Sequence, residues 1–237
     1  MGIGPGGPAD LTPRARETIA GAEVVVGYRT YLEQIVLLLE GKEVVWAGMR
    51  EEVARAREAV SRARTGRRVA VVSGGDPGVY GMAGPVLEAA GEAGVLDLVT
   101  VVPGVTAATA AAALLGAPLM HDFAVISLSD LLTPWEVIAA RLEAAAAADF
   151  VLVLYNPASS RRDWQLARAR EILLRRRRPE TPVGIVRHAG RPDEETVVTD
   201  LAGMLAYPVD MGTTVIVGNS QTYVAQGRMI TPRGYRW

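Results

Sequence analysis

The sequence predicts an α/β protein with two lobes, an N-terminal lobe built on a mostly parallel sheet and a C-terminal lobe built on a mixed sheet. In the first half, apolar β-branched runs alternate with alanine- and arginine-rich helical segments, which is typical of βαβ units. In the second half, the last strand candidates have little helix between them, which favours antiparallel hairpins. A loop-like stretch at residues 129–134 separates the two series, so we expect lobes at residues 1–130 and 131–237.

The individual elements follow from the spacing of apolar residues and from capping signals. In the N-terminal lobe, strands are expected at residues 23–26, 43–46, 68–73, 98–102 and 123–128, and helices at 51–64, 82–93 and 109–115. Thr12-Pro13 is a suitable N-cap and first-turn pair for a further helix. In the C-terminal lobe, helices are expected at 133–148 and 163–178, and strands at 150–155, 183–187, 195–199, 213–217 and 222–230.

The basic run at residues 175–178 is interpreted as the solvated end of a helix rather than as a nucleic-acid site. Cations at a helix C-terminus oppose the helix dipole favourably, and Pro179 marks the stop. The formal net charge of −1 gives no overall attraction to nucleic acid or to acidic membrane surfaces. We therefore expect a small-molecule substrate and neither a nucleic-acid nor a membrane partner.

The composition excludes several kinds of site. The 237 residues include no cysteine, so disulfides, thiolate metal sites and cysteine nucleophiles are absent. Only His121, His188 and carboxylates remain as possible metal ligands, and we expect no metal site in the protein. No long uncharged apolar window and no basic-then-apolar N-terminus is present, so we expect neither a membrane span nor a signal peptide, and a cytoplasmic location.

The most informative segment is the glycine-rich loop at residues 73–81, which reads Ser-Gly-Gly-Asp-Pro-Gly-Val-Tyr-Gly. It follows the apolar run at 69–72 and precedes a predicted helix, the position at which α/β proteins place ligands. Its glycines allow a ligand to approach the backbone closely. Asp76 places a carboxylate where phosphate-cradling loops carry Lys or Arg, so the sequence predicts a ligand other than a polyphosphate.

Two further loops accompany it, Gly-Ile-Gly-Pro-Gly at residues 2–6 and Pro-Gly-Val-Thr-Ala at 103–107. The first superficially suggests a dinucleotide fingerprint, but that motif needs a complete preceding strand, and Pro5 removes one of the required N–H donors. Each loop follows a strand or strand candidate. Since the carboxyl ends of parallel strands meet at one sheet edge, we expect the three loops to line a single cleft.

These three motifs, in this order and spacing, resemble the tetrapyrrole methylase family over essentially the whole chain. Further segments, at 27–31, 121–135, 155–157 and 218–220, are most similar to the precorrin-3B C17-methyltransferases and their cobalt-factor III counterparts. The resemblance implies an S-adenosylmethionine-dependent methyltransferase of cobalamin biosynthesis that acts as a homodimer and releases S-adenosylhomocysteine. Two positions depart from the family pattern: Met1 stands where members carry several residues before the first loop, and Gly7 where they commonly carry an acidic residue.

The resemblance also implies which residues bind the methyl donor. Members hold it folded between the two lobes, with the substrate trough in the N-terminal lobe. The matching donor positions here are Pro5, Gly74, Gly75, Asp76, Val79, Thr106, Ala107, Asn156, Ala189 and Thr213. A sulfonium carries a positive charge and no phosphate, so a loop offering backbone groups and one carboxylate suits it. Asp76 would then orient polar groups of the donor, while Thr106 and Ala107 would shape the adenosine pocket.

The implied reaction is methylation at C17 followed by ring contraction, in which a hydroxyl proton is lost and a general base helps. His121 and Asp122 are the catalytic candidates, with Ser127 and Ser129 as possible hydrogen-bonding partners. For His121, a satisfied histidine at a strand entrance is the alternative. For the carboxylate-rich substrate, the predicted binding residues are Arg29, Ser127, Ser129, Arg161 and Arg162.

Other functions remain open at this point. The nearest alternative is another member of the family, acting at a different precorrin position or on rRNA or diphthine. A nucleotide-binding module without catalysis and a nicotinamide oxidoreductase are more distant. Whether the substrate already carries cobalt leaves no signature in the protein sequence.

Overall fold

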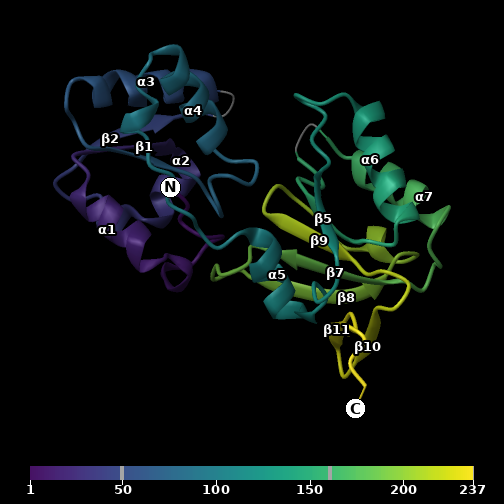
Figure 1. Ribbon diagram of the computed structural model, residues 1–237. Helices are drawn as coiled ribbons and strands as arrows, with labels where there is room; N and C mark the ends of the chain where they lie inside the picture. Colours follow the sequence, from purple (N-terminus) through teal and green to yellow (C-terminus); the bar gives the residue numbers. More distant parts are fainter. Residues whose placement is uncertain (49–50, 160–161, 237) are drawn as a thin grey trace. The chain divides into compact units, whose positions relative to one another are not determined.

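The computed structural model describes residues 1–48, 51–159 and 162–236. The chain forms two compact units, Met1–Ala107 and Ala108–Trp237, and each is an α/β layered structure (Figure 1). The sheet of the first unit is parallel and the main sheet of the second is mixed, which confirms the predicted fold class.

The division between the units falls after Ala107 and not near residues 129–134 as expected. Strand β5 (Phe123–Ser127), which the sequence analysis assigned to the N-terminal lobe, pairs along its whole length with β6 (Val151–Tyr155) in the sheet of the second unit. The composition of the loop at 129–134 suggested a hinge, but backbone pairing on both sides of that loop holds it within one unit.

The first unit is a three-stranded parallel sheet in the order β2-β1-β3, formed by β1 (Val24–Tyr28), β2 (Glu43–Ala47) and β3 (Val69–Val72). The segment Met1 to Gly4 continues it beyond β3 through a bridge between Gly2 and Ser73. The helices are α1 (Pro13–Gly21), α2 (Arg29–Gln34), α3 (Glu52–Arg64) and α4 (Ala83–Glu92), with 3-10 turns at Pro8–Asp10, Val36–Leu38 and Leu96–Leu98.

Side chains of β1 alternate between two apolar layers in this unit. Val25 packs in a cluster with Ile19 of α1 and Leu32 of α2, while Val24 and Val26 pack with Ala59 of α3. Helices therefore cover both faces of the sheet, as expected for a parallel sheet.

The strand predicted at residues 98–102 is wrong. Its start lies in a 3-10 turn and the rest is extended without a strand ladder, although the Val102 carbonyl accepts a hydrogen bond from the Gly2 N–H at 3.0 Å. Among the residues that the structure describes, the run at 98–102 takes part in no strand. Leu98 and Val101 remain about half exposed, at 53% and 45%.

The second unit is a five-stranded sheet in the order β5-β6-β9-β7-β8. Its strands are β5, β6, β7 (Pro182–Arg187), β8 (Glu195–Asp200) and β9 (Thr213–Val217); only β5 and β6 are parallel. A small sheet is formed by β4 (Gly116–Ala117), β10 (Tyr223–Ala225) and β11 (Arg228–Ile230). The helices are α5 (Ala107–Leu115), α6 (Trp135–Ala147) and α7 (Gln165–Leu174), with a 3-10 turn at Met204–Ala206.

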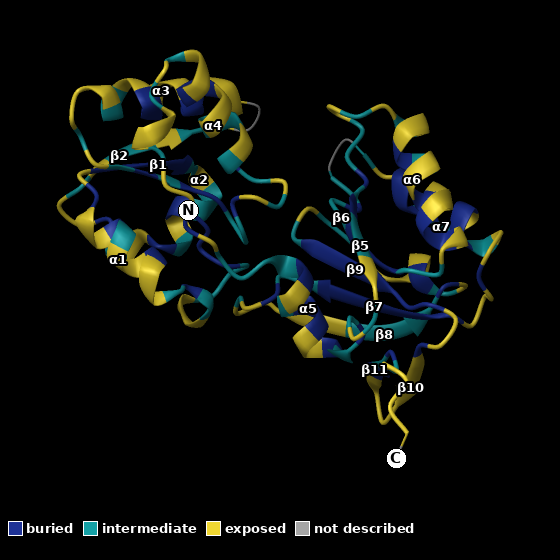
Figure 2. Cartoon of the chain, in the orientation of Figure 1, coloured by how far each residue is buried: buried dark blue, intermediate teal, exposed yellow. Residues whose placement is uncertain are grey.

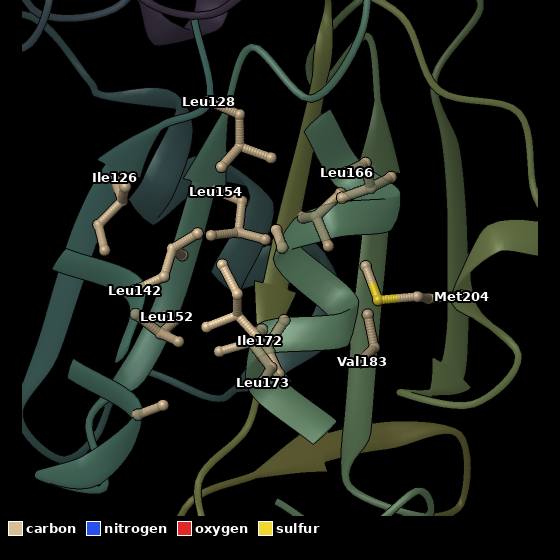
Figure 3. Packing of buried hydrophobic residues seen from close by; sticks show 14 of the residues in the cluster. Ile126, Leu128, Leu142, Leu152, Leu154, Leu166, Ile172, Leu173, Val183 and Met204 are labelled. Carbon is tan, nitrogen blue, oxygen red and sulfur yellow. The ribbon is translucent and has the colours of Figure 1, made fainter. Parts of the chain in front are cut away.

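The two faces of the five-stranded sheet bury different residues of the same strands. Leu152 and Leu154 of β6 pack with Leu142 of α6 and Leu173 of α7 (Figure 3). The intervening Val151 and Val153 pack with α5 on the other face. The outer surfaces of α6 and α7 are exposed while β7 and β9 are buried (Figure 2). This period-two pattern fixes the register of the strands that end at the candidate site.

Two expectations for the second unit need correction. The single strand predicted at 222–230 is a hairpin, because Gln226 and Gly227 adopt φ of +49° and +76° and form a two-residue turn. The basic run at 175–178 is not wholly solvated, because Arg177 is 8% exposed and donates to the carbonyls of Phe150 and Gly218.

Within residues 1–48, 51–159 and 162–236, no helix is long and apolar enough to cross a membrane. In the same part of the chain, no group of three or more His, Cys, Asp or Glu side chains could hold a metal ion.

Candidate functional site

The three glycine-containing loops meet at one edge of the sheet in the first unit. Gly4 and Gly75 exchange backbone hydrogen bonds, with the Gly4 N–H donating at 3.2 Å and the Gly75 N–H at 2.7 Å. The Gly2 N–H donates to the carbonyl of Val102, next to the third loop. The structure thus brings together the loops at 2–6, 73–81 and 103–107, as the sequence analysis expected.

Glycine is required where these loops touch. A Cβ on Gly2 or on Gly104 would lie 2.3 Å from the carbonyl oxygen of Gly75, closer than non-bonded atoms allow. Gly75 itself adopts φ of +62°, a left-handed conformation that favours glycine. The glycines of the motifs therefore serve close backbone contact between loops.

The Asp76 carboxylate ties two of the loops together. Its Oδ1 accepts the N–H of Gly78 at 2.8 Å, and its Oδ2 accepts the N–H of Gly104 at 3.0 Å. Two backbone donors of the loops are satisfied in this way. Asp76 shapes the loop edge, and its predicted role of orienting the donor stays a prediction.

The predicted donor positions of the first unit lie on this loop edge. The side of Gly75 that a Cβ would occupy faces Thr106 and Ala107, whose nearest atoms are 3.9 and 3.7 Å away. A Cβ on Gly74 would lie 2.6 Å from the Tyr31 ring. Of the remaining positions, Pro5 directly follows Gly4, and Val79 lies three residues after Asp76 in the same loop.

Arg29, a predicted substrate-binding residue, opens α2 directly after the carboxyl end of β1. Its guanidinium lies 5.4 Å from the ring centroid of Trp46, a cation–π distance. Arg29 is exposed, so its guanidinium remains accessible to a carboxylate.

In the second unit, strand register brings the other donor positions to the same end of neighbouring strands in the five-stranded sheet. Leu154 of β6 pairs with Val215 of β9, and Arg187 of β7 pairs with Thr213 of β9. Asn156, which follows β6, and Ala189, two residues after β7, therefore lie at the same edge as Thr213.

The neighbouring strand ends are braced by predicted substrate-binding residues. The Asn156 amide donates to the Ser127 hydroxyl at 2.9 Å, and the Ser129 N–H donates to the same hydroxyl at 3.2 Å. Arg162 donates to the carbonyls of Leu128 at 3.2 Å and Asn156 at 3.0 Å. Arg161 lies outside the described residues.

His121 and Asp122 lie at the opposite end of β5. Strand β5 separates them from Ser127, and its span from Phe123 to Ser127 is about 13 Å at roughly 3.3 Å per residue. His121 Nδ1 accepts the Asp122 N–H at 2.9 Å. The expected hydrogen bonding of this pair with Ser127 and Ser129 is therefore wrong, because the strand between them holds the two pairs apart.

Asp210, three residues before β9, belongs to the group around Thr213 although no sequence motif pointed to it. Its Oδ1 accepts the Thr213 hydroxyl at 2.9 Å and the Gly212 N–H at 2.8 Å, and its Oδ2 accepts from Arg187 at 3.1 Å. Burial alone would raise the pKa of Asp210, but the hydrogen bonds from Thr213, Arg187 and Gly212 together hold it below its usual value. The sequence feature that could have revealed Asp210 is its place as an acidic residue three positions before the apolar strand β9, which begins at the candidate donor residue Thr213.

Tyr155, the first residue of the Tyr-Asn-Pro segment at 155–157, has a structural role at the end of β6. Its hydroxyl accepts the N–H of Ala108 at 2.7 Å, in the first turn of α5. This contact satisfies one of the free N–H groups at a helix N-terminus. The end of β6 and the start of α5 are thereby joined within the second unit.

Comparison with known proteins gives close relatives along the whole chain. It is 51% identical over 235 residues to the "Probable cobalt-factor III C(17)-methyltransferase" of Salmonella typhimurium, covering 99% of this chain and 98% of the relative. It is 52% identical over 241 residues to the "Cobalt-factor III methyltransferase" of Priestia megaterium, covering 100% of this chain. The chain spans only 44% of the length of that second relative.

Solved structures agree in fold. The crystal structure of the methyltransferase CobJ matches with a TM-score of 0.90 and 38% identity, over 98% of this chain and 97% of that one. The uroporphyrin-III C-methyl transferase from Thermus thermophilus, complexed with S-adenyl homocysteine, matches with a TM-score of 0.71 and 29% identity, over 92% and 95% of the two chains. Residues 1–205 match the family described as Tetrapyrrole (Corrin/Porphyrin) Methylases, so this chain belongs to the tetrapyrrole methylase family.

Proposed function

We propose that the protein transfers a methyl group from S-adenosylmethionine to C17 of precorrin-3B or cobalt-factor III, with contraction of the ring, in cobalamin biosynthesis. The relative that this chain covers almost completely is named for the cobalt-factor III reaction. The observation that carries the proposal is the meeting of three glycine-containing loops at one sheet edge without a lysine or arginine among them.

The residues at this edge fit a sulfonium donor. Gly2, Gly104 and the left-handed Gly75 let the three loops pack backbone against backbone at this edge. The only charged side chain in the three loops is Asp76, which suits a cation and not a polyphosphate. We therefore propose that Pro5, Gly74, Gly75, Asp76, Val79, Thr106 and Ala107 contact the donor, together with Asn156, Ala189 and Thr213.

The protein's contribution to the chemistry is alignment. When bound, the donor supplies an electrophilic methyl group that an electron-rich pyrrolic carbon can attack directly. Positioning two reactants in this way is worth about 7–11 kcal/mol. Arg29 and Arg162 are proposed to hold substrate carboxylates, since a guanidinium pairs with a carboxylate through two parallel hydrogen bonds. The Arg162 guanidinium donates to the carbonyls of Leu128 and Asn156. The Arg29 guanidinium lies over the Trp46 ring, and we propose it as the main partner of a substrate carboxylate.

The donor site is tested by calorimetry with S-adenosylhomocysteine. Asp76→Ala is expected to weaken binding about tenfold or more, because two backbone donors of the loops lose a charged acceptor. Asp97→Ala is the matched control, a substitution of an exposed aspartate in the 3-10 turn Leu96–Leu98. Unchanged affinity in a folded Asp76→Ala protein would count against the site.

The base role of His121 and Asp122 in ring contraction is a separate proposal. His121→Ala and Asp122→Asn are each expected to slow contraction more than methylation, measured as accumulation of a methylated, uncontracted product. Parent rates of both steps in both variants would remove these residues from the mechanism.

Two properties of the whole protein are also proposed, a homodimer and a cytoplasmic location. The dimer is checked by sedimentation velocity of the purified protein, where a single species of monomer mass would contradict it.

A further inference from the structure

A cluster of charged side chains surrounds Asp210, at the edge of the five-stranded sheet where Ala189 and Thr213 lie. The cluster joins the end of β7 to the turn that precedes β9. Its members Arg187, His188, Asp193, Glu195 and Asp210 come from separate segments of the second unit.

The Asp210 carboxylate is the common acceptor of this cluster. Arg187 Nη2 donates to Oδ2 at 3.1 Å, and His188 Nε2 lies 3.1 Å from the same oxygen. The Thr213 hydroxyl and the Gly212 N–H donate to Oδ1, and the Thr213 hydroxyl in turn accepts the Asp210 N–H at 2.9 Å. One carboxylate thus fixes both strand ends.

The His188 ring is held on both sides. Its Nδ1 lies 2.5 Å from Asp193 Oδ2, and its Nε2 faces Asp210. Carboxylates only accept hydrogen bonds, so both contacts are hydrogen bonds when both ring nitrogens carry a proton. A Cβ on Gly212 would lie 2.5 Å from His188 Cδ2, so only glycine leaves room for the ring there.

The backbone of His188 is strained in a way that this cluster compensates. Its φ of +52° is a left-handed conformation that is unfavourable for a non-glycine residue. The His188 N–H donates to the Gly212 carbonyl at 3.0 Å, and the ring contacts hold the side chain in place. Ala189 is buried directly after this strained position.

We propose that Asp210 is a positioning residue of the methyl-donor site, which holds the backbone at Ala189 and Thr213 in the geometry that binds the donor. It acts through Thr213 and His188 and does not touch the reacting atoms. The inference rests on the proposed function, since that function assigns the donor to Ala189 and Thr213.

The test is a double-mutant cycle on S-adenosylhomocysteine affinity with Asp210→Asn, Thr213→Val and the double variant. Each single change is expected to weaken binding about tenfold, because each removes the charge-assisted hydrogen bond between the two side chains. The double variant is expected to lose clearly less affinity than the product of the two single losses, because the two changes share the hydrogen bond between Asp210 and Thr213. In kinetics, KM for the methyl donor rises while KM for the tetrapyrrole and kcat at saturation stay within about twofold.

Asp200→Asn is the matched control. Asp200 is the last residue of β8 in the same sheet and accepts the Gly203 N–H at 2.7 Å, but it pairs with Pro182, at the other end of β7 from Arg187. Its affinity for S-adenosylhomocysteine is expected to equal that of the parent.

A second pair covers the case in which Asp210→Asn does not fold. His188→Asn is expected to keep affinity within about threefold, because asparagine tolerates a positive φ and its amide can donate to Asp210. His188→Val is expected to lose about tenfold or more, because a β-branched residue is strained there.

The outcomes distinguish a failure of the positioning role of Asp210 from a failure of the proposed function. If the parent binds S-adenosylhomocysteine and Thr213→Val weakens it while Asp210→Asn does not, the positioning role is wrong and the proposed function stands. Additive losses in the double variant, or equal affinity of the two His188 variants, also overturn it. If the parent itself does not bind S-adenosylhomocysteine, the proposed function fails.

Discussion

Asp76 and Asp210 use the same chemistry in two different units. Each carboxylate accepts N–H groups from two places in the chain and so holds two segments of its unit together. Asp76 was found from the sequence because it stands in a glycine-rich motif. Asp210 was missed because its partners, Arg187 and Thr213, become neighbours only through the antiparallel pairing of β7 with β9.

The first prediction concerns acid stability. The pKa of Asp210 lies below its ordinary value of 3.8, so the unfolded chain binds the proton more tightly than the folded one. Its contribution to folding is present above about pH 4 and is lost as the pH falls through the folded pKa. The free energy of unfolding, measured by urea titration from pH 5 to pH 2, is expected to fall less steeply in Asp210→Asn than in the parent. Identical slopes in the two proteins would contradict the pKa assignment.

The second prediction concerns the contact between loops. Gly104→Ala is expected to destabilise the protein by about 2–3 kcal/mol, because the new Cβ would lie 2.3 Å from a backbone oxygen. Gly84→Ala is the control, in α4 with no atom within 4 Å of the added Cβ, and is expected to stabilise by about 0.5–1 kcal/mol. Urea denaturation measures both, and equal effects would mean that the loops do not meet as described.

At the level of elements, local pattern predicted most strands and helices but not their partners. The run at 98–102 has strand composition, yet it forms no strand in the described part of the chain. The segment at 222–230 was read as one strand, since nothing in Gln226-Gly227 outweighed the apolar residues on both sides. Pairing is a property of two segments, so a single run cannot reveal it.

Arg177 illustrates the same limit at the end of α7. A run of four arginines beside a helix terminus predicts side chains exposed to solvent. Arg177 instead donates to the backbone carbonyls of Phe150 and Gly218, which flank strands β6 and β9. Burial lowers the pKa of its guanidinium, which the nearby Asp149 partly offsets.

The third prediction follows from this burial. Arg177→Ala is expected to cost about 3 kcal/mol of unfolding free energy, because the carbonyls of Phe150 and Gly218 lose their donor. Arg178→Ala, at an exposed neighbour, is expected to change stability by less than about 0.5 kcal/mol. Chemical denaturation compares them, and a small effect of both would show that Arg177 is solvated after all.

At the scale of the whole molecule, the fold class and family were predictable because the three loop motifs occur in a fixed order along one chain. The loops of the first unit meet as expected, but only the loop at 73–81 follows a strand of the parallel sheet. Hydrogen bonds join the other two loops to this part of the unit, from Gly4 to Gly75 and from Gly104 to Asp76. The boundary between the units was not predictable from loop composition, because the pairing of β5 with β6 decides it. His121 and Asp122 were predicted as general bases from the motif that contains them. Strand β5, which follows them, separates them from Ser127.

The central claim is that this chain methylates a tetrapyrrole at C17. The most direct measurement incubates the full chain with precorrin-3B, or with cobalt-factor III, and S-adenosylmethionine carrying a CD₃ group, and examines the product by mass spectrometry and NMR. The account predicts one CD₃ group, attached to C17, and one S-adenosylhomocysteine per product. A CD₃ group on any other carbon, or no transfer to either substrate by a folded protein that binds S-adenosylhomocysteine, would contradict it.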